Sequence, residues 1–359
     1  MRIESLTSLR FFAALLVLLN HCEFLRHSDS VLLSNLFNYI FSQGHIAITF
    51  FFILSGFIMS LSYSDRINNK KVSYIQFYIA RISKLYPLHL LTFFLALPLV
   101  IYSTYKGSDT LNSLLPNLIL IQSFIPIREY FFSVNAPSWS LSNELFYYLI
   151  FPVIISMKNK LLIVIPLTII IFQITIELLN LPESQKHYLI YIFPISRLLD
   201  FSIGILTYRV FKAINNNKII LNSSTMQILS ILIFIIFLLI IELVIGRFNY
   251  YFLYVIPVSL LVFSFSLKEG VLSNLLLNEK LVILGKASFA LYLIHHLVIR
   301  YMLILNYKIF KFEGVVSDYF MMLSTIVISI TLSVIIYKSF ELKTTEILRR
   351  FLLKKINTL

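Results

Sequence analysis

The sequence predicts an all-α protein, a bundle of about ten helices that cross a membrane, and three observations support this. Of its 359 residues, 58% are hydrophobic and only 13% are charged, whereas soluble domains carry about 25% charged residues. The mean hydropathy is +0.86. Apolar segments of roughly 20 residues, the length that a spanning helix needs, follow one another without a long polar region between them. We therefore expect one transmembrane domain over residues 1–340, followed by a short basic cytoplasmic tail, 341–359.

Ten segments are expected to span the membrane, and the basic residues orient them. The segments are residues 6–25, 43–63, 85–104, 139–157, 161–179, 189–208, 225–246, 250–267, 287–306 and 319–338. With the N-terminus in the cytoplasm, 20 of the 30 Lys and Arg residues fall on the cytoplasmic side and eight on the outer side. This asymmetry follows the positive-inside rule, so both termini are expected in the cytoplasm.

A further apolar piece, residues 111–125, is shorter and contains Pro116. It could be an eleventh span, a re-entrant helix or an interfacial helix. A full span here would invert every later segment and place the basic tail outside the cell. The charge distribution therefore favours ten spans.

The charge and the cysteine count exclude several classes of function. A net charge of +13 could suggest nucleic acid, but in a membrane protein it is better explained by topology. The single cysteine, Cys22, cannot form an intramolecular disulfide and argues against a cysteine-ligated metal. No histidine spacing supports zinc either. We expect no nucleic acid, no metal and no tightly bound cofactor.

The first span carries two polar residues, Arg10 and His21. A charge in mid-bilayer costs about 2.5–3.5 kcal/mol on insertion scales, so such residues usually face a cavity or a partner. Eleven residues make three turns plus roughly 20°, which places both side chains on one face, about 16 Å apart along the axis. Imidazole suits proton abstraction near neutral pH. A purely structural histidine fits the pattern equally well.

A second polar stretch, APSWSLSNELFYYLIFP (136–152), opens a span at its outer end. It holds the only tryptophan, Trp139, with Ser140, Asn143 and Glu144. These groups suit a polar substrate, and a carboxylate can orient an imidazole. The alternative is an interfacial tryptophan followed by a helix cap.

A third stretch, ARISKLYPLHL (80–90), places Arg81 and Lys84 on one helix face at the cytoplasmic mouth of a span. Two cations there suit phosphate groups, although ordinary positive-inside anchoring explains them too.

Arg197 and Asp200 stand at i and i+3, the spacing of an internal ion pair. His295 and its neighbour His296 point about 100° apart, so at most one of them faces a given cavity.

Together these stretches resemble the acyltransferase 3 family of integral membrane O-acyltransferases, over nearly the whole chain. The shared elements, in order, are SLRFFAALLVLLNH (8–21), FFFILSGF (50–57), RISKLYP (81–87), PSWSLSNELFYY (137–148), RLLDFSIG (197–204) and LGKASFALYLIHH (284–296). Each element is unspecific alone, and the resemblance depends on all six in this order. The inner basic pair of the family usually reads Arg-x-x-Arg, whereas this chain has Arg81 and Lys84, and lysine lacks the fork geometry of arginine.

The resemblance implies ten helices and transfer of an acyl group, usually acetyl, from cytoplasmic acetyl-CoA or another acyl-CoA. The implied acceptor is a hydroxyl of a cell-envelope carbohydrate. We expect the protein in a bacterial inner membrane. The catalytic residues would be His21 and Glu144. The residues that bind donor and acceptor would be Arg10, Arg81, Lys84, Tyr86, Trp139, Ser140, Asn143, Arg197, Tyr292 and His295.

These residues suggest a mechanism. Arg81 and Lys84 would hold the phosphates of the acyl-CoA, and His21 would deprotonate a sugar hydroxyl, supported by Glu144. Ser140, Asn143 or Tyr292 would bind the sugar or the developing oxyanion. Two other classes of protein remain open, a transporter or flippase for lipid-linked sugars and a receptor or structural protein whose charges are only internal ion pairs.

Overall fold

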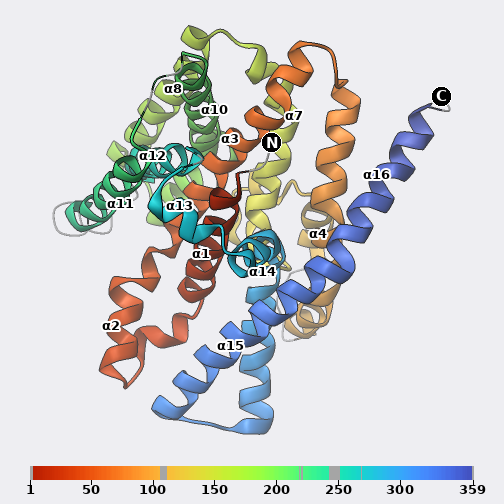
Figure 1. Ribbon diagram of the computed structural model, residues 1–359. Coiled ribbons are helices and arrows are strands. Elements are labelled where there is room, and N and C mark those ends of the chain that lie inside the picture. Colours follow the sequence, from red (N-terminus) through yellow and green to blue (C-terminus); the bar gives the residue numbers. More distant parts are fainter. Residues whose placement is uncertain are drawn as a thin grey trace.

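The computed structural model describes residues 3–105, 111–217, 219, 221–241, 251–267 and 269–357, and these residues form helices and short turns without any strand (Figure 1). Short 3₁₀ and π-helical turns connect several of the α-helices. The α-helices are α1 (Glu4–Asn20), α2 (Val31–Tyr39), α3 (Ile46–Asn68), α4 (Tyr74–Tyr105), α5 (Leu114–Leu118), α6 (Arg128–Phe131), α7 (Trp139–Ser156), α8 (Asn159–Leu178), α9 (Glu183–His187), α10 (Pro194–Asn216), α11 (Ser223–Ile240), α12 (Val255–Ser266), α13 (Val271–Leu276), α14 (Glu279–Leu305), α15 (Gly314–Ile336) and α16 (Leu342–Asn357).

Seven helical segments of the described chain are long and apolar enough to cross a membrane, which confirms an all-helical membrane protein with several spans. Each overlaps one predicted span. Residues 242–246, at the end of the predicted span 225–246, lie outside the described chain. The seven segments are Val31–Asn68, Tyr74–Tyr105, Asn159–Leu178, Glu183–Asn216, Ser223–Ile240, Glu279–Phe310 and Gly314–Ile356.

The other three predicted spans coincide with helices that are shorter or more polar. The segment 250–267 corresponds to Tyr251–Ser266, and 139–157 corresponds to α7, which carries Asn143 and Glu144. The segment 6–25 corresponds to α1, which has 17 residues and ends at Asn20. The chain leaves the helix at Cys22, with φ −78° and ψ 53°, and enters a 3₁₀ turn. His21 therefore caps the end of α1 instead of lying within a longer helix.

The segment 111–125 is too short in helical structure to form an eleventh span. It consists of two three-residue 3₁₀ turns and the five-residue helix α5. Its polar residues Asn117, Gln122 and Ser123 are buried, and they donate hydrogen bonds to Ser133, Ser138 and the backbone of Trp139. The segment thus braces the start of α7.

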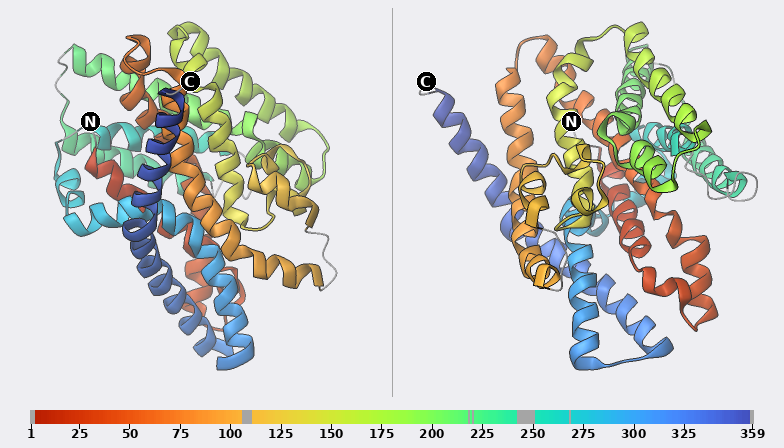
Figure 2. Two further views of the ribbon diagram at one scale, coloured as in Figure 1. Left: turned by 90° about the vertical axis from the view of Figure 1, so that its right-hand side faces the viewer. Right: turned by 180° about the vertical axis from the view of Figure 1, so that it is seen from behind.

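The centre of the bundle is built from α1, α3, α7, α10 and α14 (Figures 1 and 2). Two helix crossings there depend on glycine. A Cβ on Gly56 of α3 would lie 2.1 Å from the carbonyl oxygen of Phe201, and one on Gly204 of α10 would lie 2.0 Å from that of Ile53. Gly285 plays the same part where α14 meets α1. Such small residues let helix backbones approach closely in membranes.

The periphery exposes apolar side chains. Only 28%, 11% and 22% of the most apolar windows of Asn159–Leu178, Ser223–Ile240 and Gly314–Ile356 are buried, which is expected of helices that face lipid. The expected tail is helical in its described part. The last span continues through a π-helical turn, Tyr337–Glu341, into α16, which lies alongside α4 (Figures 1 and 2).

Candidate active site

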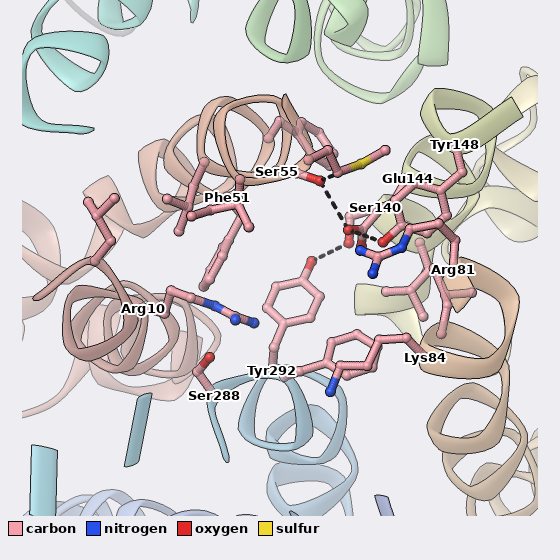
Figure 3. A pocket seen from close by; sticks show the side chains of 18 of the residues that line it. Arg10, Phe51, Ser55, Arg81, Lys84, Ser140, Glu144, Tyr148, Ser288 and Tyr292 are labelled. Atoms are coloured by element: carbon pink, nitrogen blue, oxygen red, sulfur yellow. Dashed lines mark hydrogen bonds between the residues drawn. The ribbon is translucent and has the colours of Figure 1, made fainter. Parts of the chain in front are cut away.

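A cavity of about 330 Å³ lies inside the bundle, between α1, α3, α4, α7 and α14 (Figure 3). Half of the residues that line it are apolar, with Phe51, Phe52 and Phe289 among the larger side chains. Polar groups in the interior of a membrane protein usually mark a functional site. The polar wall consists of Thr7, Arg10, Ser55, Ser62, Arg81, Lys84, Ser140, Glu144, Tyr148, Ser288 and Tyr292.

Three cations from two helices line this cavity. Arg10 enters from α1, and Arg81 and Lys84 enter from α4 (Figure 3). The guanidinium of Arg81 donates to the hydroxyl of Tyr63 at 3.0 Å and stacks 5.0 Å from that ring. Its Nε is buried without a hydrogen-bond partner among the described residues. Among the described lining residues, three cations face one carboxylate, that of Glu144, so the cavity is suited to an anion.

Glu144 faces the cavity, but its hydrogen bonds differ from those expected. The hydroxyl of Tyr148 donates to its Oε1 at 2.5 Å, and that of Ser55 donates at 3.3 Å (Figure 3). Among the described hydrogen bonds, none joins Glu144 to His21, as the predicted orienting role would require. The carboxylate instead ties α7 to α3 on the wall of the cavity.

Ser140 and Tyr292 form a hydroxyl pair on the same wall. Their oxygens lie 2.8 Å apart, and both hydroxyls are within reach of the carbonyl oxygen of Pro137, at 3.0 and 3.2 Å. The pair joins α7 to α14 on the cavity wall.

His21 pairs with His295, and backbone carbonyls determine where the protons are. Nδ1 of His21 lies 2.8 Å from the carbonyl oxygen of Val17, and Nδ1 of His295 lies 3.1 Å from that of Leu291. Because a carbonyl only accepts, each Nδ1 carries a proton. Nε2 of His295, 3.3 Å from Nδ1 of His21, is then a second and weaker acceptor of the same proton. Nε2 of His21 is left unprotonated, as a general base requires.

The histidine pair stands next to the cavity and does not line it. The ring of His295 lies 6.0 Å from that of Tyr292, which does line the cavity, and 5.0 Å from that of His21. His295 thus contacts both His21 and Tyr292, the residue of the three that lines the cavity.

Three other predicted site residues do not line the cavity, and two of them, Trp139 and Asn143, connect neighbouring elements of the bundle. Trp139 packs its ring against Tyr191, 5.2 Å away, and Asn143 donates to the carbonyl oxygen of Ile192 at 3.0 Å. Tyr86 packs 6.0 Å from the ring of His89. None of the three is among the described residues that line the cavity.

Arg197 is also buried within the bundle, with 2% of its side chain exposed. It forms an ion pair with Asp200 at 2.9 Å and donates to the hydroxyl of Thr49 at 3.0 Å. Its guanidinium stacks over Phe52 and Tyr191. This matches the internal ion pair that the i, i+3 spacing predicts.

Two residues at or beside the cavity wall, Tyr148 and Glu341, are not among those predicted from the sequence. Tyr148 stands four residues after Glu144, so helical spacing could have identified it. Glu341 forms an ion pair with Lys84 from 257 positions away, and no local pattern indicates such a contact. Ser55 and Ser288 belong to the motifs above but were given no role.

A multi-span helical protein with an internal cavity, three cations on its wall and a base-competent histidine pair beside it has the parts of a membrane-embedded enzyme. The family model described as "Acyltransferase domain" matches residues 3–338, so the chain belongs to the acyltransferase 3 family. It is similar to acyltransferase MdmB of Streptomyces mycarofaciens, at 29% identity over 327 residues, which cover 84% of this chain and 80% of that protein. No solved structure matches. The resemblance in the sequence is thus confirmed, and the protein is an acyltransferase.

Proposed function

We propose that this membrane acyltransferase moves an acyl group, in the first place acetyl from acetyl-CoA, to a hydroxyl of a cell-surface polysaccharide. The proposed acceptors are O-antigen, capsule and exopolysaccharide. We further propose ten spans, both termini in the cytoplasm and a bacterial inner membrane as the location. The observation that carries the proposal is the layout of α1, with Arg10 on the cavity wall and His21 beside the outer end.

The donor side uses the cations. Arg10, Arg81 and Lys84 attract the phosphates of coenzyme A, and the arginines add directional hydrogen bonds. Eleven residues of helix separate Arg10 from His21, about 16 Å at 1.5 Å per residue. The extended pantetheine arm covers this interval, passes through the cavity and brings the thioester toward Tyr292 and the histidine pair.

The chemical step uses His21 as general base. Its Nε2 takes the proton from the acceptor hydroxyl, and that oxygen attacks the thioester carbonyl carbon. The carbon–sulfur bond then breaks, and the thiolate of coenzyme A takes the proton from His21. His295 accepts the Nδ1–H of His21 and so supports the imidazolium formed in between. To donate to the developing oxyanion, the hydroxyl of Tyr292 or Ser140 would exchange its bond to the Pro137 carbonyl for one to that oxygen.

The test is acyl transfer by purified protein in liposomes, with radiolabelled acetyl-CoA and extracted envelope glycans. His21→Ala is expected to lower the rate by about 10²- to 10⁴-fold, the usual contribution of a general base. His27→Ala, which removes an exposed histidine of the following turn, is the matched control and should retain full activity. Full activity in a folded His21→Ala protein would overturn the assignment. Label trapped on His21 with donor alone would favour a covalent acyl-histidine.

A further inference from the structure

Glu341 is a buried acid at the junction of the last span and the C-terminal helix. It is the last residue of the π-helical turn Tyr337–Glu341, and its side chain is 1% exposed. One carboxylate oxygen pairs with the ammonium of Lys84, and the other is buried without a hydrogen-bond partner among the described residues. π-helical turns are rare and frequently occur at functional sites.

The two partners occupy different positions relative to the cavity. Lys84 lines the cavity, with 39% of its side chain exposed and its ammonium 5.8 Å from the ring centre of Phe289 (Figure 3). Glu341 is not among the described residues that line the cavity. The carboxylate thus stands behind the ammonium and neutralises it before any ligand enters.

We propose that Glu341 sets the affinity for the acyl donor by competing with its phosphates for Lys84. The proposal rests on the donor site described under the proposed function. A phosphate at Lys84 must share the ammonium with this carboxylate, and the two anions repel each other. Because Glu341 is buried, water screens this repulsion poorly. Glu341 therefore weakens the binding of the donor and keeps it readily exchangeable.

A purely structural role for Glu341 makes the opposite predictions. A brace between the π-helical turn Tyr337–Glu341 and α4 would stabilise the fold, and its loss would lower the melting temperature and leave donor affinity unchanged. Lys84 cannot be tested alone, because its removal leaves a buried, unpaired carboxylate, which is strongly destabilising. The pair must be changed together for that comparison.

The experiment measures the Kd of coenzyme A for the purified full-length protein by calorimetry, with melting temperatures recorded for every variant. Glu341→Gln, which keeps shape and removes charge, is expected to lower the Kd about five- to tenfold. Lys84→Met/Glu341→Gln should raise it above the wild-type value, because the cation is gone. Glu346→Gln, an exposed acid paired with Arg350 on the same helix, is the matched control and should leave it unchanged.

The outcomes separate the two proposals. An unchanged or higher Kd in a folded Glu341→Gln protein overturns the competition. If that variant does not fold, Glu341→Met, which buries no polar group, makes the same test. If the wild-type protein does not bind coenzyme A, the donor named under the proposed function is refuted. If the wild-type protein binds coenzyme A and Glu341→Gln leaves the Kd unaltered, only the competition is refuted.

Discussion

The imidazoles of His21 and His295 show how single hydrogen bonds prepare a base. Two backbone carbonyls, of Val17 and Leu291, hold the Nδ1 protons of both rings. The lone pair of His295 Nε2 faces the Nδ1–H of His21. That contact strengthens when His21 takes up a second proton, because imidazolium is the better donor. His295 is therefore a positioning residue that acts through His21.

We expect His295→Phe to lower kcat by about 10- to 100-fold, the size usual for a partner that orients a functional imidazole. The KM for donor should change little, because His295 does not line the cavity. His295→Gln keeps an acceptor near the position of Nε2 and should recover part of the loss. Steady-state kinetics of the three proteins check this, and equal kcat for the Phe and Gln variants would contradict it.

Arg197 and Asp200 form a buried ion pair that the cavity does not use. Removing one partner leaves the other charge uncompensated in the bundle. Arg197→Met should therefore lower the free energy of unfolding by about 3–5 kcal/mol. Arg197→Met/Asp200→Asn should recover most of this loss. Thermal unfolding in detergent measures both, and a double variant less stable than the single one would argue against the pair.

At the scale of elements, the crossing of α3 and α10 depends on the absence of two side chains. Gly56 and Gly204 each face a carbonyl oxygen of the other helix. Close contact is the main source of helix association in a membrane, where lipid tails compete equally for apolar side chains. This crossing places Ser55 on the cavity wall, one residue before Gly56.

Gly204→Ala should push the two helices apart, because its Cβ would meet the Ile53 oxygen at 2.0 Å. Overpacking of this kind costs about 1–3 kcal/mol. Val210→Ala on the same helix, at a side chain that is 53% exposed, is the matched control. The melting temperature should fall for the glycine variant and hold for the control. An unchanged melting temperature in both would show that the crossing can relax.

At the scale of the whole molecule, orientation in the membrane decides which side supplies the donor. The connection between α3 and α4 and the connection between α14 and α15 lie at opposite ends of the bundle (Figure 1). Arg66 lies in the last turn of α3 and Lys70 and Lys71 lie in the first connection, so the positive-inside rule assigns this end to the cytoplasm. The cations of the cavity would then open toward cytoplasmic acyl-CoA.

Cysteine labelling tests this orientation, because the chain has only Cys22, and that residue is buried. In a Cys22→Ser background, Glu313→Cys should react with an impermeant maleimide in intact cells. Asn69→Cys should react only after permeabilisation. Both positions are exposed and have ordinary negative φ angles. The reverse pattern would invert the topology and remove the basis for a cytoplasmic donor.

Much of the fold could be predicted because the bilayer imposes it on the chain locally. Each span needs about 20 apolar residues, so the hydropathy of 43–63 or 287–306 suffices to locate a helix. The end of α1 could not be located in this way. The predicted span runs through His21 and Glu23 to residue 25, but the backbone turns at Cys22. Hydropathy does not determine the residue at which a helix ends.

The sequence by itself determined the class of protein, the helices, the family and the identity of most polar residues on the cavity wall. Arg10, Arg81, Lys84, Ser140, Glu144 and Tyr292 stood out because a membrane interior penalises such side chains unless they have a use. Only the tertiary structure decided their partners. Glu144 bonds to Tyr148 and Ser55, His21 pairs with His295, and Lys84 meets Glu341. Most of these partners come from different helices. Hydropathy and helical spacing describe one helix at a time, whereas the packing of helices sets the distances between side chains on different helices.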